Sequence, residues 1–364
     1  MKTIKFTSSD NNQKQFVIAL RKNVNDYFKT NAISTKGNNT MYIKAIAMLS
    51  IYIIPFFLIL LVPINTAVAI LLVILMGIGE GGIGMSVMHD AAHGAFSRNK
   101  KINNIFASTM FLLGSNTFNW KVQHNILHHT FTNIYGYDQD IETKAVLRLC
   151  EHAPKKKFHR FQYIYAFFFY GLMTLSKLIT DIFQLIEFNT SGITKEQHHN
   201  PKIEIIRLLF SKIVYFSIII GLPILFTPYT WWQVLIGFFI LHFTSGIIMS
   251  TVFQMAHVVN GVEQPLPNKN NIITNEWAVH QLRTTADFAK DNKLLNWYVG
   301  GLNFQIEHHL FPNICHIHYP KIAPIVEKTA LDFGIAYHTK STFLNALKSH
   351  IKKLKELGIQ TKTI

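Results

Sequence analysis

The sequence predicts an all-α integral membrane protein, with four transmembrane helices in two hairpins and a helical cap on the cytosolic side. Three observations lead to this fold class. Hydrophobic residues make up 49% of the 364 positions and charged residues only 15%, against about a quarter in soluble domains. Four apolar segments each approach the roughly 20 residues that a helix needs to cross a bilayer. The Lys and Arg residues, which give a formal net charge of +15, lie in the polar stretches between these segments.

The N-terminal segment, residues 1–40, is polar and basic, and we expect it to be cytosolic. It contains no apolar core of signal-peptide length. Apolar side chains recur in it at helical spacing, at Val17, Leu20, Val24, Tyr27 and Phe28. This spacing predicts an amphipathic helix, lying either on the membrane surface or packed on the protein itself.

The first predicted hairpin consists of two apolar segments, residues 41–62 and 67–88, joined by a short connection. Pro55 is expected to kink the first of these spans. Glycines crowd the end of the second span, at Gly77, Gly79, Gly81, Gly82 and Gly84. Because glycine has no Cβ atom, we expect another helix to pack closely against this part of the span.

The long segment that follows has only marginal apolar stretches. The stretch over residues 163–185 carries Lys177 and Asp181, and charge at the bilayer centre is costly, so we expect an interfacial or re-entrant helix there. A second hairpin is predicted from two further spans, residues 205–226 and 231–255, with a four-residue connection.

These elements give a domain organisation and an orientation. Residues 41–335 form one membrane domain, and residues 336–364 form a basic amphipathic C-terminal helix. Two hairpins place both termini and both long polar regions on one side. The Lys and Arg of these regions identify that side as the cytosol, and therefore the inner membrane in a bacterium. The same distribution argues against a nucleic-acid partner, and two cysteines are too few for a disulfide framework.

Histidines form clusters near the predicted cytosolic ends of the spans. The clusters are His89-Asp-Ala-Ala-His93, His124-Asn-Ile-Leu-His128-His129 and Gln305-Ile-Glu-His308-His309, with a further His257 at the end of the fourth span. On a helix, side chains three or four positions apart lie on one face, so each cluster can direct its imidazoles toward a metal.

Clusters at the cytosolic ends of both hairpins can meet at one depth. Eight imidazoles and a Gln exceed the four ligands of a tetrahedral zinc site, so the number of ligands indicates two metals. Imidazole suits iron, which can change its redox state and activate oxygen. The residues therefore predict a di-iron oxidation site.

With these motifs, the sequence resembles the membrane-bound fatty acid desaturases, which carry three histidine boxes. The resemblance covers roughly residues 45–335. The third box begins with Gln305 within the stretch 300–312, which is similar to the front-end and bacterial linoleoyl-CoA-desaturase-like branch. Members of this branch insert a double bond between an existing one and the carboxyl end of the acyl chain.

The resemblance implies an oxidoreductase that desaturates an acyl-CoA or an acyl-lipid, with two iron ions as cofactor and O2 as co-substrate. The metal ligands that it implies are His89, His93, His124, His128, His129, His257, His308 and His309. Gln305 stands where other branches have a His ligand, and whether it binds metal directly, through water or not at all is left open.

The electron donor is expected to be a separate protein. Many front-end desaturases carry a fused cytochrome b5 domain with a His-Pro-Gly-Gly motif, and these 364 residues contain no such motif. The resemblance then implies a ferredoxin, or a cytochrome b5 with its reductase. A basic stretch, Lys155, Lys156, Lys157 and Arg160, either docks such an acidic protein or reflects contact with anionic lipid.

Several polar residues near the boxes are candidates for orienting the imidazoles by accepting their second N–H, with loop capping as the alternative. They are Asp90, Asn125, Asn133, Asp138, Asp140 and Asn303. Two cations beside the boxes, Lys121 and Arg98, are candidates for holding a phosphate-bearing headgroup.

Two other functions are compatible with part of this pattern. A di-iron hydroxylase or ketolase would use the same ligands, and the Gln-type third box favours desaturation over it. A His-lined metal transporter would place polar residues in the middle of the spans, whereas the clusters lie at the span ends.

Overall fold

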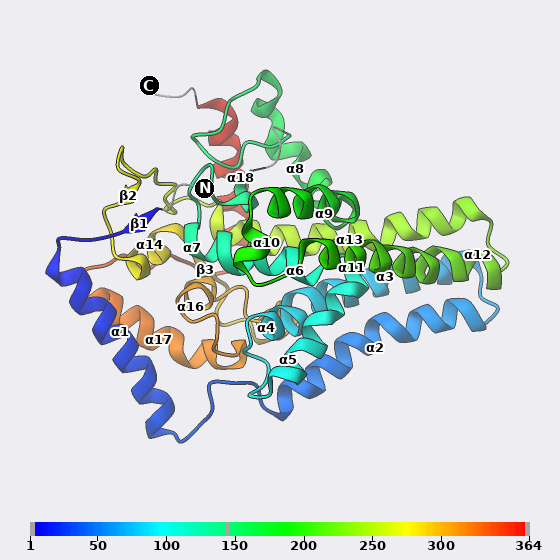
Figure 1. Cartoon of the computed structure of the whole chain (residues 1–364), viewed down its shortest axis with the longest axis horizontal. Coiled ribbons are helices and arrows are strands. Elements are labelled where there is room, and N and C mark those ends of the chain that lie inside the picture. Colours follow the sequence, from blue (N-terminus) through cyan, green and yellow to red (C-terminus); the bar gives the residue numbers. More distant parts are fainter. Residues whose placement is uncertain (1–3, 143–145, 361–364) are drawn as a thin grey trace.

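The computed structural model describes residues 4–142 and 146–360, so the predicted terminal segments 1–40 and 336–364 lie partly outside the described residues. A set of long helices extends side by side toward one end of the molecule, and the other helices gather at the opposite end (Figure 1). The molecule is therefore divided into a bundle of long apolar helices and a cap.

Among the described residues, four helices are long and apolar enough to cross a membrane. The first is α2 (Asn39–Leu61), and the fourth is α13 (Trp231–His257). The second, Thr66–Ala92, is built from α3 (Thr66–Gly82), η1 (Ile83–Met88) and α4 (His89–Ala92). The third, Pro201–Phe226, is built from α11 (Pro201–Phe216), η6 (Ser217–Gly221) and α12 (Leu222–Phe226).

These helices correspond to the four predicted spans, with two differences at their ends. The third helix starts four residues earlier, because Asn200 accepts hydrogen bonds from the first backbone N–H groups and Pro201 suits the first turn. The second helix continues to Ala92 through the π-helical turn η1. The first histidine pair therefore begins on the spanning helix itself rather than after it.

The glycines of α3 are contact points with its neighbours, as their lack of a Cβ atom suggests. A Cβ atom on Gly77 would lie 2.7 Å from the Leu241 carbonyl oxygen of α13, and one on Gly79 would lie 2.8 Å from the Tyr52 backbone nitrogen of α2. The α3 helix packs against both α2 and α13. Close approach of backbones thus holds the centre of the bundle together.

The marginal apolar stretch forms a bent pair of helices. It comprises η5 (Lys157–Phe161), α8 (Gln162–Gly171) and α9 (Met173–Thr190), with a bend of 73°. The charge of Asp181 is paired, because Asp181 Oδ2 lies 3.1 Å from the buried Lys212 Nζ of α11. By length and composition alone, the pair is a broken span or a re-entrant segment. The sequence predicted an interfacial or re-entrant helix here, and this stays a prediction.

The cap uses the amphipathic terminal helices as packing elements. The α1 helix (Asn11–Thr30) buries Phe16, Leu20, Val24 and Phe28 against α17 (Tyr319–Asp332). Its apolar face is therefore covered by the protein, which decides between the two predicted roles of this helix. The C-terminal α18 (Phe343–Ile359) packs on α8 and η5.

The remaining elements are short and connect the bundle with the cap. The helices are α5 (Lys100–Ala107), η2 (Ser108–Leu113), α6 (Thr117–Trp120), η3 (Lys121–His128), α7 (His129–Phe131), η4 (Gln139–Ile141), α10 (Ile193–Glu196), α14 (Trp277–Thr284), α15 (Lys293–Tyr298), α16 (Gln305–Leu310) and η7 (His316–His318). Two parallel pairs of short strands, β1 (Lys5–Phe6) with β2 (Ile272–Ile273) and β3 (Asp287–Phe288) with β4 (Thr339–Lys340), join distant segments.

Candidate metal centre

The three histidine clusters and His257 meet between the bundle and the cap. The first cluster ends the second spanning helix in α4, and the second cluster lies on η3 and α7. The third cluster forms the short α16, and His257 is the last residue of α13. The second cluster is wound as a π-helix, and such turns are rare and frequent at functional sites.

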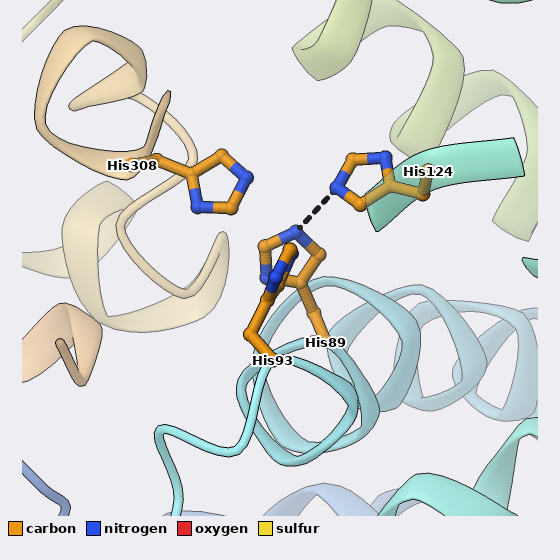
Figure 2. A group of neighbouring side chains, drawn as sticks. All are labelled: His89, His93, His124 and His308. Carbon is orange, nitrogen blue, oxygen red and sulfur yellow. Dashed lines mark hydrogen bonds between the residues drawn. The ribbon is translucent and has the colours of Figure 1, made fainter. Parts of the chain in front are cut away.

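Four imidazoles form the first group, from three separate elements. His89, His93, His124 and His308 each offer a ring nitrogen, and these nitrogens all lie within 4.8 Å of one another. The Nε2 atoms of His89 and His124 are 3.2 Å apart. Figure 2 shows the four rings turned toward one central point.

The second group consists of His128, His257 and His309, whose ring nitrogens also lie within 4.8 Å of one another. His129 stands between the two groups. Its Nε2 is 3.2 Å from His124 Nε2 in the first group, and its ring stacks on His309 of the second at a centroid distance of 4.4 Å. All eight predicted histidines are therefore in one continuous cluster.

Gln305 lies at the second group. Its amide nitrogen is 2.8 Å from His257 Nε2, and its amide oxygen is buried without a hydrogen-bond partner among the described residues. The side chain that replaces a His in the third box thus faces the same group of imidazoles.

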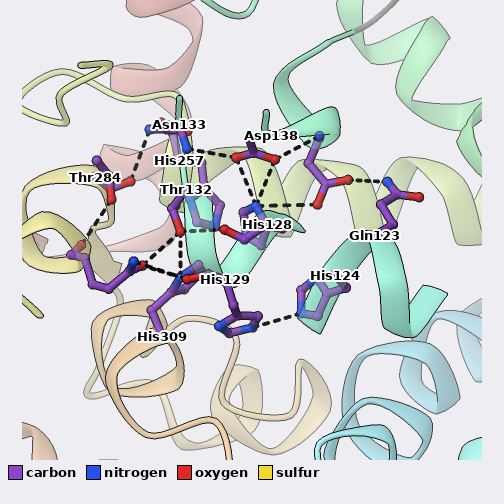
Figure 3. A network of polar contacts seen from close by, with 12 residues as sticks. Gln123, His124, His128, His129, Thr132, Asn133, Asp138, His257, Thr284 and His309 are labelled. Carbon is purple, nitrogen blue, oxygen red and sulfur yellow. Dashed lines mark hydrogen bonds and ion pairs between the residues drawn. The ribbon is translucent and has the colours of Figure 1, made fainter. Parts of the chain in front are cut away.

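The His128 imidazole is fixed by carboxylates. Its Nδ1–H donates to both oxygens of Asp138, at 3.0 and 3.1 Å, and Asp140 Oδ2 lies 3.5 Å away (Figure 3). Asp138 is held in turn by the Asn133 backbone N–H, which donates to Asp138 Oδ2 at 2.8 Å. This leaves Nε2 of His128 directed into the cluster.

The third box is fixed by neutral partners. His309 Nδ1–H donates to the Gln281 side-chain oxygen at 2.8 Å, and the Thr132 hydroxyl donates to the same oxygen at 2.8 Å. His308 Nδ1 lies 3.4 Å from the Tyr319 hydroxyl. In both histidines the opposite nitrogen, Nε2, is buried and has no hydrogen-bond partner among the described residues.

These unpaired nitrogens fit a metal site. Buried polar atoms in proteins are nearly always hydrogen-bonded, yet His93, His128, His308 and His309 each keep a buried Nε2 without a partner in the described chain. A metal ion would satisfy them, and an orienting group on the opposite ring nitrogen is the usual arrangement around metal-binding histidines. The donor set, nitrogen-rich and without thiolate, suits iron.

Burial also keeps most of the imidazoles in the form that binds metal. It holds the pKa values of His93, His124, His129, His308 and His309 well below the usual range for histidine, and repulsion between neighbouring imidazoles adds to this effect. These rings are therefore neutral near pH 7, with lone pairs available. His128 differs, because burial opposes its protonation but Asp138 more than offsets this and raises its pKa.

Other predicted orienting residues make different contacts. The Asn125 amide donates to the Ala92 backbone oxygen, and the Asn303 amide donates to the Phe288 backbone oxygen. The Asn133 amide donates to backbone oxygens, including that of His257. These asparagines fix the backbone around the boxes rather than an imidazole.

Asp90 connects the first box with a histidine outside the boxes. It accepts from His316 Nδ1–H at 2.8 Å, and its other oxygen is 3.9 Å from His89 Nδ1. His316 Nε2 contacts Lys44 Nζ at 2.6 Å. This chain of buried polar groups runs along the side of the first group.

Sequence reasoning missed the residues that reach the centre from distant segments. Thr132 and Gln281, which meet at His309, are 149 positions apart. Trp120 packs its indole ring on His124 at 4.5 Å, between ring centroids, and also contacts His89 and His93. The only sequence signal among these residues is that Trp120 stands four positions before His124, which puts both on one face of a helix.

Comparison with known proteins identifies the family of this chain. The family described as fatty acid desaturase matches residues 61–341. The sn-1 linoleoyl-lipid 6-desaturase of Arthrospira platensis is 34% identical, covering 94% of this chain and 93% of the relative. The protein of the same name from Synechocystis sp. is 33% identical over 98% of both chains. The acyl-lipid (8-3)-desaturase of Physcomitrium patens is 31% identical over 98% of this chain and 74% of its own. The chain therefore belongs to the fatty acid desaturase family, in the membrane-bound front-end branch, and is a fatty acyl desaturase.

Proposed function

We propose that the chain inserts a cis double bond into an acyl chain of a membrane lipid, between an existing double bond and the carboxyl end, at a two-iron centre. The observation that carries the proposal is the convergence of eight imidazoles, seven of them buried and His93 half-buried, from four segments on two adjacent points. Three relatives whose names specify lipid-bound acyl substrates support an acyl-lipid rather than an acyl-CoA.

The two groups of imidazoles would each hold one iron. His89, His93, His124 and His308 would bind the first, and His128, His257 and His309 the second, with His129 between them. Gln305 would complete the surroundings of the second. When bound, the irons supply the oxygen chemistry that removes hydrogen from an unactivated methylene, which no amino-acid side chain can do.

The protein's own residues would position the metals and exclude water. Asp138, Gln281 and Tyr319 hold the Nδ1 side of three imidazoles, so that each Nε2 is presented in a fixed direction. Trp120 covers the first group from the side of the apolar helices. An acyl chain that passes along this indole would bring its methylenes to the centre.

The proposed orientation follows from charge. The connections at the far ends of the spanning helices, residues 62–65 and 227–230, contain no charged residue. The positive-inside rule then supports two hairpins whose ends, together with both termini and the cap, face the cytosol. Electrons would come from a separate acidic redox protein, a ferredoxin or a cytochrome b5, docking on this basic side.

The experiment that tests the function is lipid analysis by gas chromatography and mass spectrometry. Cells expressing the chain, supplied with linoleate and an electron donor, should contain an unsaturated acid that is absent from cells expressing His308→Ala. Derivatisation of the product should locate the new bond on the carboxyl side of an existing one. A hydroxylated acid in its place would contradict the desaturation chemistry.

Measuring the iron content of the purified protein distinguishes a chain that has not folded from a folded chain that binds no iron. The purified wild-type chain should be folded and contain iron. Folded protein that binds no iron would overturn the di-iron proposal, whatever the lipid analysis shows.

A further inference from the structure

A pocket opens at the edge of the apolar helices. It has a volume of about 340 Å³ and is lined by seven of the residues between 108 and 121, by His199, and by Glu204, Arg207 and Ser211 of α11. Ile105 of α5 and Ile206 and Phe210 of α11 are exposed on the flanking helices. Exposed apolar side chains on both sides place the pocket where the spanning helices would enter the hydrocarbon.

The charges in the pocket leave one cation without a partner. Glu204 accepts from Arg207 at 2.8 Å and from His199 Nδ1–H at 2.9 Å. Within the described residues, no carboxylate lies within 4 Å of Lys121 Nζ. Burial, with a contribution from the positive charge of Lys100, lowers the pKa of Lys121. An anion bound in the pocket would compensate the Lys121 charge.

The pocket lies close to the reacting centre. Lys121 directly follows Trp120, whose indole contacts three of the four histidines of the first group. Carbon 6 of an acyl chain is five carbon–carbon bonds from the carboxyl carbon, a reach of roughly 6 Å. An enzyme that acts near the carboxyl end must therefore hold the ester and headgroup within this short distance of its metals.

We propose that this pocket binds the phosphate-bearing headgroup of a glycerophospholipid substrate, which would contact Lys121 and those guanidinium N–H groups of Arg207 that do not donate to Glu204. The inference rests on the proposed function, which it deepens by naming the carrier of the acyl chain. The Asn116 side chain and Ser211 add polar groups on the pocket wall. The position at the edge of the hydrocarbon favours a lipid over coenzyme A, although both carry phosphate.

Direct binding tests the pocket without relying on catalysis. Wild type, Lys121→Met and Arg207→Met in detergent would be titrated with a short-chain phosphatidylglycerol, with coenzyme A and with inorganic phosphate, using tryptophan fluorescence. We expect the phospholipid to bind wild type about tenfold more tightly than either variant. Arg98→Met is the matched control, because Arg98 is the other cation beside the boxes but does not line the pocket and contacts Ser34 instead. It should bind like wild type.

Turnover gives the second test. Desaturation of a phospholipid, relative to that of an uncharged glycolipid with the same acyl chains, should fall about tenfold in Lys121→Met and recover in Lys121→Arg. Thermal unfolding of each variant identifies one that fails to fold, in which case Lys121→Gln replaces it.

The outcomes separate this inference from the proposed function. Equal phospholipid binding by wild type and both pocket variants would overturn it, as would preferential binding of coenzyme A or of an uncharged glycolipid. A wild-type protein that desaturates nothing, but loses phospholipid binding with Lys121→Met, would support the pocket while contradicting the proposed function.

Discussion

At the residue scale, the centre depends on groups that contact the imidazoles on the side away from the proposed metals. The clearest example is Asp138, which is fully buried and accepts from His128 Nδ1–H with both oxygens. Such a carboxylate fixes the ring and raises its strength as a ligand.

Asp138→Asn should therefore lower iron affinity and desaturation by roughly 10- to 100-fold while the protein remains folded. An amide can present only one acceptor to His128, and it carries no charge. The measurement is iron per chain after equilibration at limiting iron, together with product formation. Asp26→Asn, on the exposed face of α1, is the control and should match wild type. Full iron affinity in Asp138→Asn would contradict the assigned role.

Some of the residues that contact these imidazoles could be predicted from the sequence. Asp138 and Asp140 follow the second box closely, so their approach to His128 needed only a short loop. Gln281, Tyr319 and Thr132 could not be assigned, because their contacts with the third box depend on how α14, α17 and α7 pack in three dimensions. Asn125 and Asn303 looked equivalent to Asp138 in the sequence, and the structure turns both toward backbone oxygens.

At the scale of elements, the spanning helices could be predicted from the sequence, because a helix that crosses the hydrocarbon must be a long apolar segment. Their π-helical turns η1 and η6, and the π-helix η3 of the second histidine cluster, could not be predicted, since no residue pattern distinguished them from α-helix. For the glycines of α3, the sequence predicted that they make close contacts but not which helix each of them contacts. The sequence indicated close packing, and the structure shows which glycine faces which neighbour.

Gly79→Ala should destabilise the bundle, because the added Cβ would meet the backbone of α2 at 2.8 Å, where no side chain can move aside. We expect a cost of about 1–3 kcal/mol and a lower unfolding temperature in detergent. Gly237→Ala in α13 is the matched control, since its Cβ would have its nearest contact at 3.7 Å. Equal unfolding temperatures for the two variants would contradict this account of the packing.

At the scale of the whole molecule, the C-terminal helix is tied to the bundle through a buried histidine. His350 of α18 donates from Nδ1 to the Val258 backbone oxygen at 2.7 Å, and its Nε2 accepts from the Tyr170 hydroxyl at 2.9 Å. Burial lowers the pKa of His350 to about 4. The sequence offered no pattern that predicts this role for His350.

The stability of the folded protein should therefore decrease as the pH is lowered, because His350 becomes protonated. Because the folded pKa lies below the unfolded value of about 6.5, the unfolded chain binds more protons between these values. The stabilisation is fully present above about pH 6.5 and is lost as the pH falls toward 4. The unfolding temperature of wild type should drop more between pH 7 and pH 5 than that of His350→Gln. Parallel pH profiles for the two proteins would exclude this role.

The orientation in the membrane can be tested because both native cysteines, Cys150 and Cys315, are buried. Single cysteines introduced at Pro63 and Pro228 should react in intact cells with a maleimide that cannot cross the membrane. A cysteine at the exposed Lys195 should react only after the cells are opened. The opposite pattern would invert the proposed topology.

The most direct measurement of the central claim is the iron content of the purified, folded chain. Two irons per chain are expected for wild type, and fewer for His93→Ala in the first group and for His309→Ala in the second. These counts would show that the two groups of imidazoles are two iron sites. Wild-type protein that is folded and active with zinc, with a single iron or with no metal would contradict the account.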